Sequence, residues 1–105
     1  MIINITDQNI DEVLSTNKLV VIDFWSVGCA RCTEFVAPIL EDIAEEYQNK
    51  IIIAKLNIRE NLHSYLKYQI KTIPTVLFIK NNEIIKQFTD SITKALLIEN
   101  IEFFS

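Results

Sequence analysis

Residues 20–32 read Val-Val-Ile-Asp-Phe-Trp-Ser-Val-Gly-Cys-Ala-Arg-Cys, an apolar run that one acid interrupts and a CxxC pair closes. The run is apolar on both alternations from Leu19 to Trp25, as expected for a central strand covered on both faces. Asp23 is therefore expected to be buried, which is unusual for an acid. A helix pattern begins at Cys29 and Cys32, where a thiol would face unpaired backbone N–H groups and the positive end of the helix dipole. This placement favours a thiolate and indicates chemistry at the cysteines.

The composition predicts one compact domain, residues 1–105, with 50% hydrophobic and 23% charged residues. The net charge is −4 and no basic run is present, which argues against nucleic acid or an anionic membrane as the partner. No apolar run approaches the length of a membrane span, and the first residues lack a signal-peptide pattern. We therefore expect a cytoplasmic monomer with protein partners, in which a CxxC is catalytic or metal-binding.

A metal site is the weaker interpretation of the two cysteines. Together with the single histidine, His63, they make a poor zinc set, which carboxylates or a second copy would have to complete. His63 also falls off the apolar face of its expected helix, so we interpret it as a surface residue. We expect neither a metal nor a cofactor.

The first half of the chain alternates helix and strand patterns. Thr6 is expected to cap a helix over Asp7–Thr16. After the cysteines, apolar residues from Phe35 to Tyr47 recur at helical spacing and predict a long amphipathic helix. Pro38 inside that helix removes one backbone donor, so we expect a kink there. Residues 51–57 predict a second buried strand.

The second half predicts a short helix, a hairpin and a last helix. The apolar face of the short helix is expected to carry Leu62, Tyr65 and Leu66. Asn81 and Asn82 can both take positive φ, which favours a type I′ hairpin between strands 75–79 and 84–88. Thr93 is expected to cap a last helix with Leu97, Ile98, Ile101 and Phe104 facing inward. The order β-α-β-α-β-α-β-β-α predicts a mixed sheet with helices on both faces.

Five segments together resemble thioredoxin over nearly the whole chain. They read VVIDFW before the cysteines, CARC, APILEDIAEEY after them, AKLNI in the second buried strand, and YQIKTIPTVLFIKNNE around the second proline. A CxxC alone is a weak signal, but a CxxC in this context is a strong one. The resemblance implies an α/β thioredoxin fold, a central mixed five-stranded sheet flanked by four helices. It also implies a protein-disulfide reductase that receives electrons from thioredoxin reductase.

The resemblance implies catalytic roles for four residues. Cys29 would be the exposed nucleophilic thiolate that attacks a substrate disulfide, and Cys32 the partly buried thiol that resolves the mixed disulfide. Asp23, with Lys55 from the neighbouring strand, would help to take the proton from Cys32. A satisfied structural ion pair is the alternative interpretation of Asp23 and Lys55.

Further residues would bind the substrate. Pro74 would be cis and would leave the Ile73 backbone free to pair with an extended substrate segment. Trp25 would pack beneath the active-site loop, or would be plain core. Gly28 stands where the family usually has tryptophan, and Ala30-Arg31 stands where it has Gly-Pro, so the docking surface is expected to differ.

Two other departures concern the backbone. The family's glycines in the hairpin turn and after the last strand correspond to Asn82 and Asp90, residue types that tolerate left-handed conformations. From Cys32 to Pro38 there is one more residue than the family usually has. We expect a single wide turn or π-bulge around Thr33–Val36 to absorb it.

Two rival functions stay open at this point. One is a non-catalytic binding module that docks one dedicated partner through the altered surface. The other is a disulfide oxidase or isomerase, because Arg31 beside the thiolate would stabilise the reduced form. The intact cysteine pair argues against the first, and the cytoplasmic setting against the second.

Overall fold

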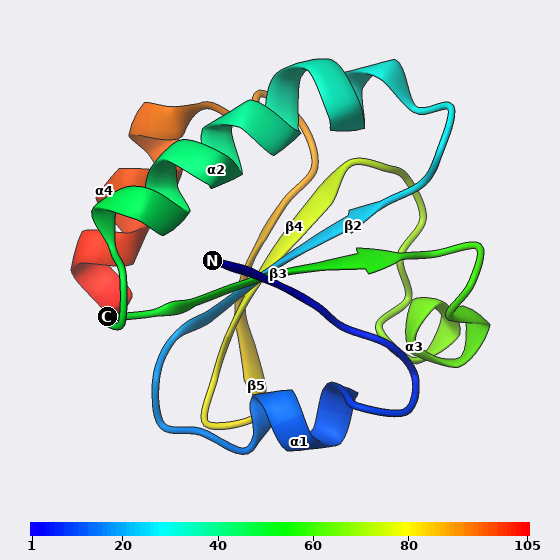
Figure 1. The fold of residues 1–105 in the computed structure, drawn as a ribbon, viewed down its shortest axis with the longest axis horizontal. Helices are drawn as coiled ribbons and strands as arrows, with labels where there is room; N and C mark the ends of the chain where they lie inside the picture. Colours follow the sequence, from blue (N-terminus) through cyan, green and yellow to red (C-terminus); the bar gives the residue numbers. More distant parts are fainter.

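The computed structural model describes all 105 residues and contains a five-stranded sheet in the order β1-β3-β2-β4-β5 (Figure 1). Its strands are β1 (Ile2–Asn4), β2 (Val20–Trp25), β3 (Ile52–Asn57), β4 (Thr75–Lys80) and β5 (Glu83–Phe88). The first three strands pair in parallel, and β4 and β5 add antiparallel pairs. The predicted mixed sheet is thus confirmed.

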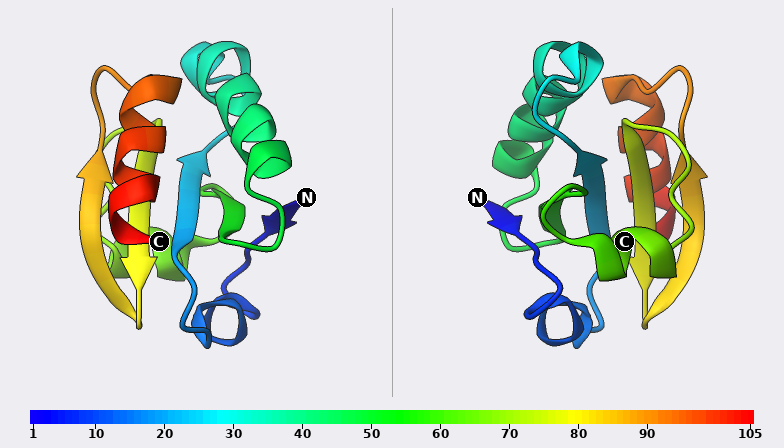
Figure 2. Two further views of the ribbon diagram at one scale, coloured as in Figure 1. Left: turned by 90° about the vertical axis from the view of Figure 1, so that its left-hand side faces the viewer. Right: turned by 90° about the vertical axis from the view of Figure 1, so that its right-hand side faces the viewer.

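Four α-helices flank the sheet on both faces. They are α1 (Ile10–Leu14), α2 (Ala37–Glu46), α3 (Leu62–Lys67) and α4 (Lys94–Phe104), and a π-helix, Arg31–Val36, runs directly into α2. Helices α2 and α4 lie on one face and α1 and α3 on the other, and the two panels of Figure 2 look onto these opposite faces. Each face therefore has its own hydrophobic core.

Strand β2 lies between the two cores. Val21 packs into the core beneath α2 and α4, whereas Ile22 and Phe24 pack into the core on the α1 and α3 side. Successive side chains of a strand point to opposite faces, so a strand covered on both faces must be apolar on both alternations. Asp23 lies on this strand and is only 4% exposed, as the sequence predicts.

Helix α3 differs from the sequence prediction. Leu62 and Leu66 are exposed and Ser64 is fully buried, although Tyr65 packs against the core as predicted. The cause is a distant acid, because the Asp7 carboxylate accepts hydrogen bonds from the backbone N–H groups of His63 at 3.2 Å and Ser64 at 2.9 Å. This capping from another part of the chain sets the helix orientation, and the local apolar pattern does not encode it.

Helix α1 begins later than predicted. Its N-cap is Asn9, and the residues after Thr6 form a turn in which the Thr6 hydroxyl accepts from the Asn9 N–H at 3.2 Å. Asp7 cannot join the helix in this arrangement, since it caps α3. The predicted helix therefore loses its first turn.

The turn and cap predictions in the second half are largely confirmed. Asn81 and Asn82 have φ values of 51° and 65°, as a type I′ turn requires. The Thr93 hydroxyl accepts from the Leu96 N–H at 3.1 Å and caps α4. The left-handed residue after β5 is Ser91, with φ of 54°, and not Asp90 as predicted.

Candidate active site

The cysteines lie where β2 ends and the helical segment begins. Cys29 and Cys32 form a disulfide with their Cα atoms 5.3 Å apart. The backbone N–H of Cys32 donates to the Cys29 Sγ at 3.2 Å, so the first cysteine sits at an unpaired donor of the helix start. Cys32 is 1% exposed and Cys29 is half-buried. The two sulfurs are therefore unequal, and Cys29 is the one that solvent and a substrate can reach.

Gly28 precedes the pair in a conformation that requires glycine. Its φ is +88°, in the region that residues with a Cβ rarely adopt. A Cβ at this position would meet no atom within 4 Å, so backbone geometry and not crowding selects the glycine. The neighbouring Val27 is exposed, and no aromatic side chain stands immediately before the first cysteine.

The extra residue is absorbed in the π-helix, as predicted. The backbone N–H of Ala37 donates to the carbonyl of Cys32, five residues earlier. A π-helix turns about 80° per residue and an α-helix about 100°, so the combined segment brings Cys32, Val36 and Leu40 to one side. All three are buried. At Pro38, where the sequence predicts a kink, the π-helix has just ended, and Pro38 lies in the first turn of α2.

Asp23 is a buried acid with an unsatisfied oxygen. Its Oδ1 atom has no hydrogen-bond partner. Burial raises its pKa from the usual 3.8 to about 7, although the positive charge of Lys55 acts in the opposite direction. Asp23 can therefore exchange a proton near neutral pH, which few carboxylates can do.

Lys55 lies beside Asp23 but does not form an ion pair with it. The two residues are register partners on β2 and β3, as predicted. The only ion pairs of the chain belong to Lys94, and the Lys55 Nζ lies 5.6 Å from the centre of the Trp25 ring. The alternative interpretation of these two residues as a satisfied ion pair is therefore wrong, because Lys55 is half-buried and turns its ammonium to the indole.

A small cavity connects these groups. It has a volume of about 30 Å³ and is lined by Ile2, Asp23, Ala37, Leu40, Glu41 and Lys55. Such a space is large enough for a water molecule, and the three charged side chains supply polar partners. Asp23 and Lys55 can thus communicate through water, close to the helix that carries Cys32.

The Ile73–Pro74 segment adjoins the same end of the sheet. Phe24 of β2 pairs with Thr75 of β4, which places Pro74 next to the end of β2. The Ile73–Pro74 peptide is cis, as expected, and Pro74 is buried. Neither the N–H nor the carbonyl of Ile73 takes part in backbone hydrogen bonding. This half-buried residue therefore offers a free donor and a free acceptor.

Phe35 is a site residue that sequence reasoning misplaced. The apolar spacing predicts an inner position for it, but it is 64% exposed. It borders a groove of about 300 Å³ that Arg31, Val36, Ser91 and Ile92 complete. Counting back from the buried Leu40 at about 100° per residue places Phe35 about 140° away around the helix, and this count is the signal that locates it on the outside.

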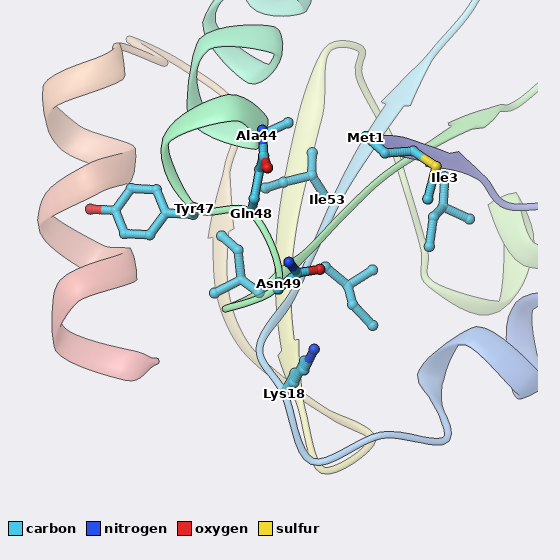
Figure 3. Close-up of a pocket in the computed structure, with 10 residues that line it drawn as sticks. Met1, Ile3, Lys18, Ala44, Tyr47, Gln48, Asn49 and Ile53 are labelled. Carbon is cyan, nitrogen blue, oxygen red and sulfur yellow. The ribbon is translucent and has the colours of Figure 1, made fainter.

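A second groove lies at the opposite end of the sheet. It has a volume of about 230 Å³ and is bordered by Met1, Lys18, the end of α2 and the start of β3 (Figure 3). Lys18 precedes β2 and Cys29 follows it, so the length of the strand separates this groove from the disulfide. No group of three or more His, Cys, Asp or Glu side chains converges anywhere in the chain.

Comparisons with known proteins agree with this geometry. A family model described as Thioredoxin matches residues 1–103. The chain is similar to the thioredoxin of Buchnera aphidicola subsp. Acyrthosiphon pisum, with 41% identity over 96% of this chain and 94% of the relative. It is 36% identical to thioredoxin 2 of Chlorobaculum tepidum, over 92% and 89% of the two chains.

A longer relative combines two activities in one chain. The bifunctional thioredoxin reductase/thioredoxin of Mycobacterium leprae is 35% identical over 94% of this chain and 22% of its own length.

None of the helices in the structure is long and apolar enough to cross a membrane.

Proposed function

This chain belongs to the thioredoxin family and is a protein-disulfide reductase, and on that premise we propose that Cys29 is its nucleophile and Cys32 its resolving thiol. The Cys29 thiolate attacks one sulfur of the substrate disulfide, forms a mixed disulfide and expels the other sulfur as a thiolate. The Cys32 thiolate then attacks the Cys29 Sγ and releases the substrate as a dithiol. Two electrons and two protons pass to the substrate, and the chain is left with the Cys29–Cys32 disulfide.

The observation that carries this assignment is the inequality of the two sulfurs. The Cys29 Sγ accepts the backbone N–H of Cys32, and the same hydrogen bond would stabilise a thiolate at Cys29. Cys32 is buried and bonded to Cys29, so a substrate sulfur would meet the Cys29 sulfur first.

We propose that Asp23 accepts the proton that the Cys32 thiol loses when it attacks. A carboxyl with a pKa of about 7 can accept a proton from a thiol and release it near neutral pH. The cavity that Asp23, Glu41 and Lys55 line has room for a water molecule, which would carry the proton onward from Asp23. In this proposal Lys55 tunes the acid through its charge and does not bond to it.

The substrate would lie along the Ile73–Pro74 segment. The unpaired Ile73 N–H and carbonyl would pair with an extended segment of the substrate, as an added strand pairs with a sheet edge. Trp25 would support the cysteine loop from below, and Gly28 would let the substrate backbone come close. Arg31 would contact the substrate beside the disulfide.

The electrons would come from a thioredoxin reductase. The name of the Mycobacterium leprae relative gives both activities for one chain, which supports this pairing. Disulfide-containing proteins would be the substrates, and we propose that residues 1–105 act as one monomeric cytoplasmic domain.

The test is to trap the mixed disulfide. Reduced Cys32→Ser protein, incubated with an oxidised protein substrate, should form a covalent complex through Cys29 that dithiothreitol releases. Cys29→Ser is the matched control and should form none. Complexes of equal amount with both variants would contradict the assignment, and no complex with either would favour a non-catalytic binding module.

A further inference from the structure

The π-helix places one cationic and one aromatic side chain on the same exposed side. Arg31 and Phe35 are four residues apart, and at about 80° per residue they lie within about 40° of each other around the helix. Cys32 and Val36 have the same spacing on the buried side. An exposed phenylalanine is uncommon, and Phe35 is 64% exposed although the neighbouring Val36 is buried.

The opposite wall of the groove is held in place by the start of α4. Ser91 has a left-handed φ of 54° and Ile92 packs against the core beneath α2 and α4. Thr93 follows and fixes the loop by capping the helix through the Leu96 N–H. The groove between these residues and Phe35 has a volume of about 300 Å³, so it can take a large side chain.

Arg31 gives the groove a positive charge. It is exposed and forms no ion pair, so its guanidinium is available to a partner. Arg31 is also the only charged residue that lines the groove, since Glu34 and Asp90 lie outside the lining. A guanidinium binds a carboxylate through two parallel hydrogen bonds, and a carboxylate is the anion that the side chains of a protein substrate carry.

The groove adjoins the reacting centre, because Arg31, which lines it, lies between the two bonded cysteines in the chain. We propose that it is a specificity site for the protein substrate, which places a large apolar residue against Phe35 and a carboxylate against Arg31 beside its disulfide. This inference rests on the proposed function and adds the chemistry of the preferred substrate.

The experiment compares the rates at which the reduced protein reduces short peptides with an internal disulfide. The peptides differ only at the two positions that flank one cysteine. One of these positions carries Leu or Ala and the other carries Asp or Lys, and both arrangements are made, with the apolar position before the cysteine or after it. Samples are quenched with acid and the peptide dithiol is measured by mass spectrometry. In the best flanking order, Leu should be preferred over Ala by about tenfold, as expected for a buried aliphatic side chain. Asp should be preferred over Lys by about two- to fivefold, and less at high salt.

The variants are judged by these ratios and not by their absolute rates. Phe35→Ala should remove the preference for Leu and keep that for Asp, and Arg31→Ala should do the reverse. Phe103→Ala is the matched control, because Phe103 is 79% exposed at the far end of α4, and it should keep both preferences. Equal rates in every flanking order, or an unchanged Leu preference in Phe35→Ala, would overturn the specificity site alone. Failure of the wild type to reduce any peptide would overturn the proposed function as well.

Discussion

Replacing Asp23 by Asn should stabilise the oxidised protein, and the gain should depend on pH. The folded-state pKa of Asp23 is about 7 because of burial, whereas an unfolded chain has the usual 3.8. Through Asp23 the folded protein therefore binds more protons than the unfolded one in this interval, and the contribution of Asp23 to wild-type stability falls as pH rises from about 4 to about 7. The two pKa values differ by an amount that corresponds to about 4 kcal/mol. This value is an upper bound on the stabilisation by Asp23→Asn, since the amide that replaces the carboxylate is also buried and would also have an oxygen without a hydrogen-bond partner.

The measurement is urea unfolding of the wild type and Asp23→Asn at half-unit steps from pH 4 to pH 9. The difference in free energy of unfolding should be close to zero at pH 4, grow through pH 7 and level off above it. Asp11→Asn, at an exposed position, should follow the wild type throughout. Parallel curves for the wild type and Asp23→Asn would refute the buried, charged acid. A turnover rate unchanged from pH 6 to pH 9 in Asp23→Asn would leave Asp23 a structural role only.

Three further predictions concern the helix starts. Arg31→Ala should lower the reduction potential by roughly 20 to 30 mV in a glutathione titration, because a stabilisation of the Cys29 thiolate by about 1 kcal/mol is expected from a cation at this exposed site. An unchanged potential would show that Arg31 does not stabilise the thiolate. Thr93→Ala should cost about 1 kcal/mol in urea unfolding because the N-cap bond to Leu96 is lost, and an unaltered midpoint would contradict that cap. Deleting Glu34 should leave the fold and the reductase activity intact, because the shortened segment can form an ordinary α-helix that keeps the buried residues on one side. An unfolded circular dichroism spectrum would argue against the π-helix as the site of the extra residue.

The parts of the structure that the sequence predicted depend on local patterns and on counting. The apolar alternation of β2 predicts its two covered faces and the burial of Asp23. The spacing from Cys32 to Pro38 predicts the π-helix, because one residue too many must be absorbed where a proline already lacks its N–H.

The errors arise from contacts between distant parts of the chain. Asp7 caps α3 across more than fifty residues, so the apolar pattern at Leu62 and Leu66 does not decide which face is buried. Lys55 is correctly placed beside Asp23 by strand register, but its ammonium turns to the Trp25 ring. Register fixes where a side chain starts, and packing decides where its charged end lies.

The inequality of the two thiols is the central claim and can be measured in the reduced protein. Alkylation by iodoacetamide, followed for each cysteine by mass spectrometry of its peptide from pH 4 to pH 10, gives two rates and two thiol pKa values. Cys29 should react much faster than Cys32 and titrate well below the ordinary thiol value of about 8.5, because it is accessible and accepts a helix-start N–H. Equal rates and an ordinary pKa at both cysteines would contradict the account.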